Sequence, residues 1–160
     1  MWITLEDIED NSNIYIGVDV ADINGTGPAE IFVTSLNLQR TSLTSFVLEY
    51  TGKDFEKIVE TARWYFRVAD LPSRGKILLG QKHEHNNAFI GDIYEMSWQG
   101  HEYVPSDKIK IRGAANVLGL TLGEVTNEGE EIAVAYNDID YLQIFDPKGE
   151  VLWKVAERLG

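Results

Sequence analysis

The residues whose types and spacing could do chemistry are concentrated in residues 22–30. Asp22, Asn24 and Glu30 place side-chain oxygens at the first, third and ninth positions of this segment. Pro28 can give its carbonyl oxygen at the seventh, and Thr26 occupies the fifth without a charge, which should weaken binding. Calcium takes about six to eight oxygens from alternating loop positions, so the segment predicts a weak calcium site. The alternative is that the Asp and Asn side chains only accept hydrogen bonds from a turn.

Two other clusters are weaker candidates. His83 and His85 lie on one side of an extended segment and could bind a transition metal, but the polar residues that follow favour a solvated loop. Asp138 and Asp140 could form a carboxylate pair, but their surroundings are more typical of a hairpin tip. The sequence has no nucleophile elbow, phosphate-binding loop or dinucleotide fingerprint. We therefore predict no catalytic residue.

The candidate residues lie in turns between short apolar strands that recur along the chain. In each copy, an apolar strand meets an acidic residue, a polar turn follows, and a second apolar strand leaves it. The copies cover residues 20–33, 68–79 and 122–134. A second hairpin follows each copy, and its glycines, Gly52, Gly100 and Gly149, are 48 and 49 residues apart. A period of this length, built of four strands, is typical of a propeller blade.

The repeat predicts an all-β fold of three four-stranded antiparallel propeller blades in one domain, residues 1–160. The blades are placed at residues 14–62, 63–112 and 113–160, and residues 1–10 are expected to form the outer strand of a preceding blade. Such a chain forms only part of a propeller, because closed propellers typically have about four to eight blades.

Two local expectations follow from this alignment. The apolar spacing within residues 55–62 and 151–159 also fits an amphipathic helix. Pro105 in the equivalent part of the second repeat would break a helix, so we expect strands at all three places. The extra residues of the third repeat are placed in an enlarged loop within residues 108–117.

The second strand of each repeat carries two apolar residues at alternating positions, which we expect to be buried between neighbouring blades. They are Ile31 and Val33, Ile77 and Leu79, and Ile132 and Val134. The four tryptophans are expected to pack between blades, with an aromatic sugar-binding platform as the alternative. They are Trp2, Trp64, Trp98 and Trp153.

Residues 22–30, between the strand that ends at Val20 and Ala21 and the one that begins at Ile31, resemble the FG-GAP or VCBS repeat. This is the blade motif of integrin alpha-chain propellers and of many exported bacterial proteins. The resemblance covers the chain as three degenerate copies, of which the first is close, but the family prefers aspartate at the position of Thr26. It implies calcium as a cofactor, a role in binding or adhesion, and an extracytoplasmic location.

The charge of the chain bears on its partners. The 160 residues include 14 Lys and Arg against 26 Asp and Glu, a net charge of −12, which argues against nucleic acid and anionic membranes. No apolar run approaches the length of a membrane-spanning helix, and no signal peptide is expected. Residues 63–112 carry a net charge of +2 between flanks of −8 and −6. This asymmetry fits parts that attract one another in an assembly, or ordinary surface variation.

Together these features predict a noncatalytic propeller segment that binds a protein or a glycan, with calcium in the first blade. The alternatives are part of a propeller-type hydrolase or lyase, and a purely structural segment of a larger propeller. Three blades cannot close a ring, so both terminal blades would expose an apolar face. We therefore expect either the remainder of a longer propeller chain or self-association as a homodimer through these faces.

Overall fold

The structure is a computed structural model that describes residues 13–83, 91–111, 115–125, 131–137 and 141–155. Every regular element in these ranges is a β-strand, and every strand pair is antiparallel. The prediction of an all-β fold is therefore confirmed. Within the same ranges, no element is a helix of the length and apolarity that crossing a membrane requires.

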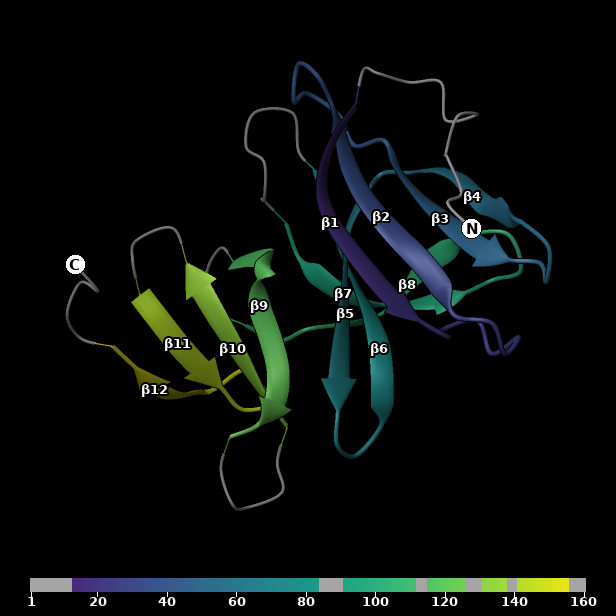
Figure 1. The fold of residues 1–160 in the computed structure, drawn as a ribbon. Coiled ribbons are helices and arrows are strands. Elements are labelled where there is room, and N and C mark those ends of the chain that lie inside the picture. The colour runs from purple at the N-terminus through teal and green to yellow at the C-terminus, as the bar shows by residue number, and fades with distance from the viewer. Residues whose placement is uncertain (1–12, 84–90, 112–114, 126–130, 138–140, 156–160) are drawn as a thin grey trace.

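The twelve strands within the described ranges form three four-stranded sheets, each in chain order (Figure 1). The first sheet contains β1 (Asn13–Ala21), β2 (Glu30–Asn37), β3 (Ser45–Tyr50) and β4 (Phe55–Ala62). The second contains β5 (Trp64–Leu71), β6 (Gly75–Lys82), β7 (Ile93–Trp98) and β8 (Tyr103–Lys108). The third contains β9 (Ala115–Glu124), β10 (Glu131–Asn137), β11 (Tyr141–Phe145) and β12 (Val151–Lys154). The strands expected around residues 55–62, Pro105 and residues 151–154 are therefore present, and no helix replaces them.

The three regularly spaced glycines occupy matching turns. Gly52, Gly100 and Gly149 have φ angles of 89°, 86° and 86°, a region that side chains rarely adopt. Each lies in the turn between the third and fourth strands of its sheet. The spacing of these glycines thus reflects one backbone conformation that is used three times.

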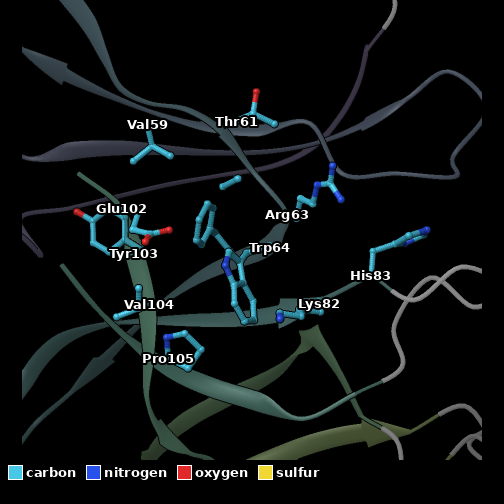
Figure 2. Close-up of a pocket in the computed structure, with 12 residues that line it drawn as sticks. Val59, Thr61, Arg63, Trp64, Lys82, His83, Glu102, Tyr103, Val104 and Pro105 are labelled. Atoms are coloured by element: carbon cyan, nitrogen blue, oxygen red, sulfur yellow. The ribbon is translucent and has the colours of Figure 1, made fainter. Parts of the chain in front are cut away.

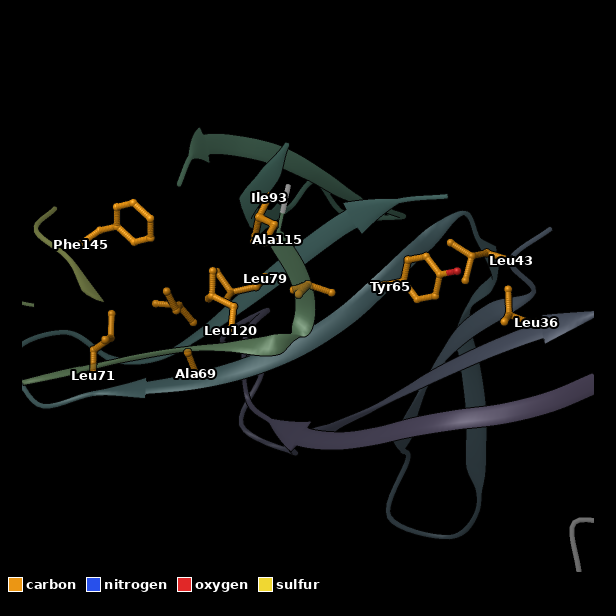
Figure 3. Packing of buried hydrophobic residues seen from close by; sticks show 12 residues of the cluster. Leu36, Leu43, Tyr65, Ala69, Leu71, Leu79, Ile93, Ala115, Leu120 and Phe145 are labelled. Carbon is orange, nitrogen blue, oxygen red and sulfur yellow. The ribbon is translucent and has the colours of Figure 1, made fainter. Parts of the chain in front are cut away.

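The first strand of the second sheet lies between the other two sheets, because β5 contacts both β1 and β9. One apolar cluster, which includes Phe32 and Leu78, fills the space between the first and second sheets. A larger cluster joins the second and third sheets and extends to Leu36 and Leu43 of the first (Figure 3). In it, Leu79, Leu120 and Phe145 are each 1% exposed or less. The core is therefore made at sheet–sheet junctions.

The predicted core positions are correct in the second sheet and displaced by one residue in the first. Ile77 and Leu79 are 8% and 0% exposed and belong to the cluster shared with the third sheet. Phe32 packs against the second sheet. Its neighbours Ile31 and Val33 belong instead to a small cluster made of first-sheet residues, on the opposite face. The prediction for Ile31 and Val33 was therefore wrong about the face.

Strand pairing gives the reason for this displacement. Ala21 at the end of β1 lies opposite Glu30, whereas Ala69 in β5 lies opposite Ile77. Glu30, not Ile31, is therefore the structural counterpart of Ile77, and a shift of one residue moves a whole set of side chains to the other face. The third predicted pair, Ile132 and Val134, lies outside the residues whose side chains are described.

A polar side chain at the same position of β2 and β6 joins each sheet to the next. Thr34 Oγ1 accepts a hydrogen bond from the Phe66 amide at 3.0 Å and donates to the Phe66 carbonyl at 3.3 Å. Gln81 Nε2 donates to the Ala115 carbonyl at 2.7 Å, and its Oε1 accepts from the Val117 amide at 2.9 Å. Thr34 and Gln81 are both buried, so each junction contains satisfied polar groups within its apolar packing.

The enlarged loop expected within residues 108–117 is shorter than predicted. Ala115 and Val117 are buried in β9, where the Gln81 amide holds their backbone. The connection between β8 and β9 spans residues 109–114, whereas Arg63 alone connects β4 to β5. The connection from the second to the third sheet is therefore longer than that from the first to the second, but it ends before Ala115, where β9 begins. The strand expected at residues 1–10 lies outside the described residues.

Candidate functional site

The predicted calcium loop is a hydrogen-bonded turn between β1 and β2. Asp22 Oδ1 accepts a hydrogen bond from the Gly25 amide at 2.9 Å. Asn24 Oδ1 accepts one from the Thr26 amide, also at 2.9 Å. Pro28 is exposed. The side-chain oxygens at the first and third positions therefore stabilise the backbone of the turn, as Asp and Asn commonly do.

Glu30 closes the loop from a buried position. Its side chain is 0% exposed, and its Oε2 accepts hydrogen bonds from the Ile23 amide at 2.8 Å and from the Tyr103 hydroxyl at 3.0 Å. Burial raises the pKa of Glu30, and the hydrogen bonds from Ile23, Tyr103 and Asn24 partly offset this. Burial and the Glu30 carboxylate raise the pKa of Tyr103, so its phenol stays protonated and donates. Glu30 thus connects the loop to the second sheet.

Glu49 on β3 holds the loop from its other side. Its Oε2 accepts hydrogen bonds from Asn24 Nδ2 at 2.7 Å and from Thr26 Oγ1 at 3.0 Å. Among the described residues, no group of three or more His, Asp or Glu side chains is close enough together to hold a metal. Calcium binding at this loop stays a prediction. It requires oxygens that now serve the turn to coordinate the cation as well.

A cleft of about 630 Å³ opens between the first and second sheets (Figure 2). Its walls come from β4 on one side, from β5, β6 and β8 on the other, and from the connecting residue Arg63. Its charged and aromatic lining includes Arg63, Trp64, Lys82, His83, Glu102 and Tyr103. Tyr103 therefore reaches two places, because its ring lines the cleft while its hydroxyl binds Glu30.

Trp64 lies in the middle of the cleft, between Pro105 and Lys82 (Figure 2). Trp64 and Lys82 are direct partners across the β5–β6 ladder, and Lys82 Nζ lies 5.0 Å from the centre of the indole ring. Tyr94 meets the indole edge-on, with ring centres 6.3 Å apart. The indole is therefore held in place by its neighbours while it remains half-exposed to the cleft.

The positive charges of the cleft are not neutralised within the described part of the chain. Arg63 and Lys82 form no ion pair there, and Glu102 pairs only with the neighbouring His101, at 3.6 Å. In a smaller cleft of about 280 Å³ between the second and third sheets, two of the three lining cations, Arg74 and Lys108, are paired with carboxylates of the described residues, and Lys110 is not. There Arg74 Nη1 pairs with a Glu95 oxygen at 3.0 Å. The first cleft is therefore the better candidate for binding an external ligand.

His83 lies at the outer end of the first cleft. The Tyr65 hydroxyl and His83 Nδ1 are 2.8 Å apart, and burial raises the pKa of Tyr65 to about 12, so the phenol stays protonated. Figure 2 shows the imidazole directed away from Trp64. Its predicted metal-binding partner, His85, lies outside the described residues, as do Asp138 and Asp140.

The cleft was not predicted from the sequence, because four strands and a connecting residue supply its lining. A comparison of the chain with protein-family models, with curated proteins and with solved structures finds no match. The assignment of this cleft as the candidate site therefore rests on the geometry of the cleft alone.

Proposed function

We propose that this chain is a noncatalytic binding module of the β-propeller type and that its ligand is a glycan bound in the cleft around Trp64. Three features support the propeller arrangement. The sheets follow one another in chain order, β5 lies between β1 and β9, and Gly52, Gly100 and Gly149 share one turn conformation. An extracytoplasmic location belongs to the same proposal and follows from the family resemblance alone.

The single observation that carries the glycan proposal is a half-exposed indole inside a cleft with polar rims. A volume of about 630 Å³ lies within the range of about 300–1,000 Å³ that is typical of small-ligand sites. An aromatic face packs against the C–H groups of a sugar ring, while polar side chains at the rim hydrogen-bond its hydroxyls. Trp64 supplies the face, and Arg63, Lys82 and Glu102 supply polar groups around it.

A glycan array tests this proposal, with the full chain, the Trp64→Leu variant and a matched Trp153→Leu control. Trp153 is 50% exposed on β12, outside the cleft, so its loss removes an indole without touching the proposed site. We expect the wild-type chain and the control to bind the same glycans and Trp64→Leu to lose at least tenfold in affinity. Melting curves of all three proteins check that the variants fold.

Two results would overturn the proposal. If the wild-type chain binds no glycan, or if Trp64→Leu binds as tightly as the control, the cleft is not a sugar site. A bound oligosaccharide that is then cleaved would favour the alternative hypothesis, a propeller-type hydrolase or lyase. Product analysis after incubation of the full chain with each bound glycan distinguishes binding from turnover.

A further inference from the structure

We propose that the cleft selects acidic glycans and that Lys82 and Arg63 recognise the carboxylate of a uronic acid residue stacked on Trp64. This inference rests on the proposed function and names the class of ligand. Figure 2 shows Lys82 beside the indole of Trp64 and Arg63 toward the same side of the view, with its guanidinium directed away from the ring. A sugar ring on the indole would therefore present a ring substituent to positive charge on that side.

The contact between Lys82 and Trp64 explains how the ligand would enter. Lys82 Nζ covers the indole at 5.0 Å, and the residue is exposed. A cation–π contact at an exposed site is weaker than a charge-assisted hydrogen bond to a carboxylate. A uronate would therefore draw the ammonium from the ring to its carboxylate and free the indole face for the sugar. A neutral sugar would have to displace Lys82 without that compensation.

Arg63 adds a second cation to the lining of the cleft. It is exposed, it forms no ion pair with any described carboxylate, and its guanidinium can donate two parallel hydrogen bonds to a carboxylate. It is the single residue that connects β4 to β5, so the two walls of the cleft hold its backbone from both sides. The cleft therefore offers an anion two donors at its rim.

The distribution of charge over the chain makes this cleft distinct. The protein has a net charge of −12, but residues 63–112 have a net charge of +2. In the cleft between the second and third sheets, Arg74 is neutralised by Glu95. The lining of the first cleft carries two cations, Arg63 and Lys82, against one carboxylate, Glu102, whereas the chain as a whole is strongly acidic, which favours selection by charge.

The experiment compares two matched ligands by isothermal titration calorimetry: an oligosaccharide of galacturonic acid and the corresponding galactose oligosaccharide. Four full-length proteins are used: wild type, the Arg63→Gln/Lys82→Gln variant, Trp64→Leu, and a Lys53→Gln/Lys148→Gln control. Lys53 and Lys148 are exposed in turns outside the cleft, so the control has the same net charge as the first variant. Melting curves confirm that each protein folds.

We expect wild type and the control to bind the uronate at least tenfold more tightly than the neutral sugar. The Arg63→Gln/Lys82→Gln variant should lose this preference and bind the two ligands with equal affinity, whereas Trp64→Leu should lose both ligands. Equal binding of the two ligands by wild type, or loss of preference in the control as well, would overturn this inference and leave the proposed function intact. Binding of neither ligand in this assay, together with a blank glycan array, would overturn both.

Discussion

At the scale of single residues, Glu30 connects the β1–β2 loop with the second sheet. Its carboxylate is buried and accepts hydrogen bonds from the Ile23 amide and from the Tyr103 hydroxyl. Because Asp22 is close enough to oppose its ionisation, desolvation and like charge both raise the pKa of Glu30. The stability of this contact therefore depends on pH.

The first prediction is that ionisation of Glu30 destabilises the fold. Its pKa is higher in the folded chain than the ordinary value of 4.5. The stability that the protonated form contributes is therefore fully present below pH 4.5 and is lost as the pH rises through the raised pKa. Relative to Glu30→Gln, wild type should lose free energy of unfolding over that window. Urea denaturation at several pH values measures the difference, and parallel pH profiles would contradict the prediction.

The second prediction concerns calcium. Millimolar calcium should raise the melting temperature of the wild-type chain, because a ligand that binds only the folded state stabilises it. Asp22→Ala should abolish this gain. It should also cost about 0.5–1.5 kcal/mol in chelator, because the Gly25 amide loses its acceptor. Asp70→Ala, at the equivalent position of the second sheet, is the control and should keep the gain. Identical wild-type melting curves in calcium and in chelator would exclude the site.

At the scale of elements, the strands were predictable from the sequence, whereas the phase of one of them was not. Consecutive side chains of β2 and of β6 are buried, so both faces of each strand carry apolar residues. An uninterrupted apolar run such as residues 31–33 has no polar alternation to set which residue faces which neighbour. Eight residues separate Ala21 from its partner Glu30, whereas seven separate the equivalent Ala69 from its partner Ile77. The additional residue moves the pattern to the other face.

The third prediction tests this difference in phase. Ile77→Ala should cost about 2–5 kcal/mol of unfolding free energy, because Ile77 is buried against the third sheet. Ile31→Ala removes the same atoms from a half-buried position on the opposite face of the first sheet and should cost less than half as much. Urea denaturation of both variants gives the two values. Equal losses would mean that the two residues have equivalent surroundings.

The lining of the cleft comes from strands of two sheets, and their relative packing cannot be read from the sequence. Only one local signal pointed to it: Trp64 and Lys82 are symmetrically placed about the β5–β6 turn, so a hairpin makes them partners. Arg63 joins them because the connection from β4 to β5 is a single residue. The opposite wall requires knowledge of how β4 packs against the second sheet, which no local pattern encodes.

At the scale of the whole molecule, β1 exposes apolar side chains on the outer face of the first sheet, whereas its counterpart β5 is covered on the same face. Val18 is 61% exposed, and its counterpart Phe66 is 2% exposed beneath the first sheet. Val20, the counterpart of Val68, is 49% exposed. At the other end of the molecule, β12 exposes Val151, Leu152 and Trp153. These surfaces favour the proposed contact with a second copy or with the remainder of a longer propeller.

The fourth prediction follows from these faces. Sedimentation velocity of the full chain at micromolar concentration should show a homodimer. Val18→Asp with Val20→Asp should convert it to a monomer, because each change places a charge on the proposed contact face. Thr51→Asp, on an exposed turn, is the control and should leave the dimer intact. A wild-type monomer at this concentration would contradict the prediction.

The paired roles of Thr34 and Gln81 have a consequence for how the molecule unfolds. Each side chain binds the backbone of the first strand of the following sheet, where an edge would otherwise carry unsatisfied amides and carbonyls. Separating two neighbouring sheets would exchange these hydrogen bonds for bonds to water and would expose the apolar surface of the junction, which is the larger cost. No sheet can therefore be lost as an independent unit at low cost. The three sheets should behave as a single cooperative foldon, in which the amides of Phe66 and Val117 exchange with solvent only when the whole chain opens.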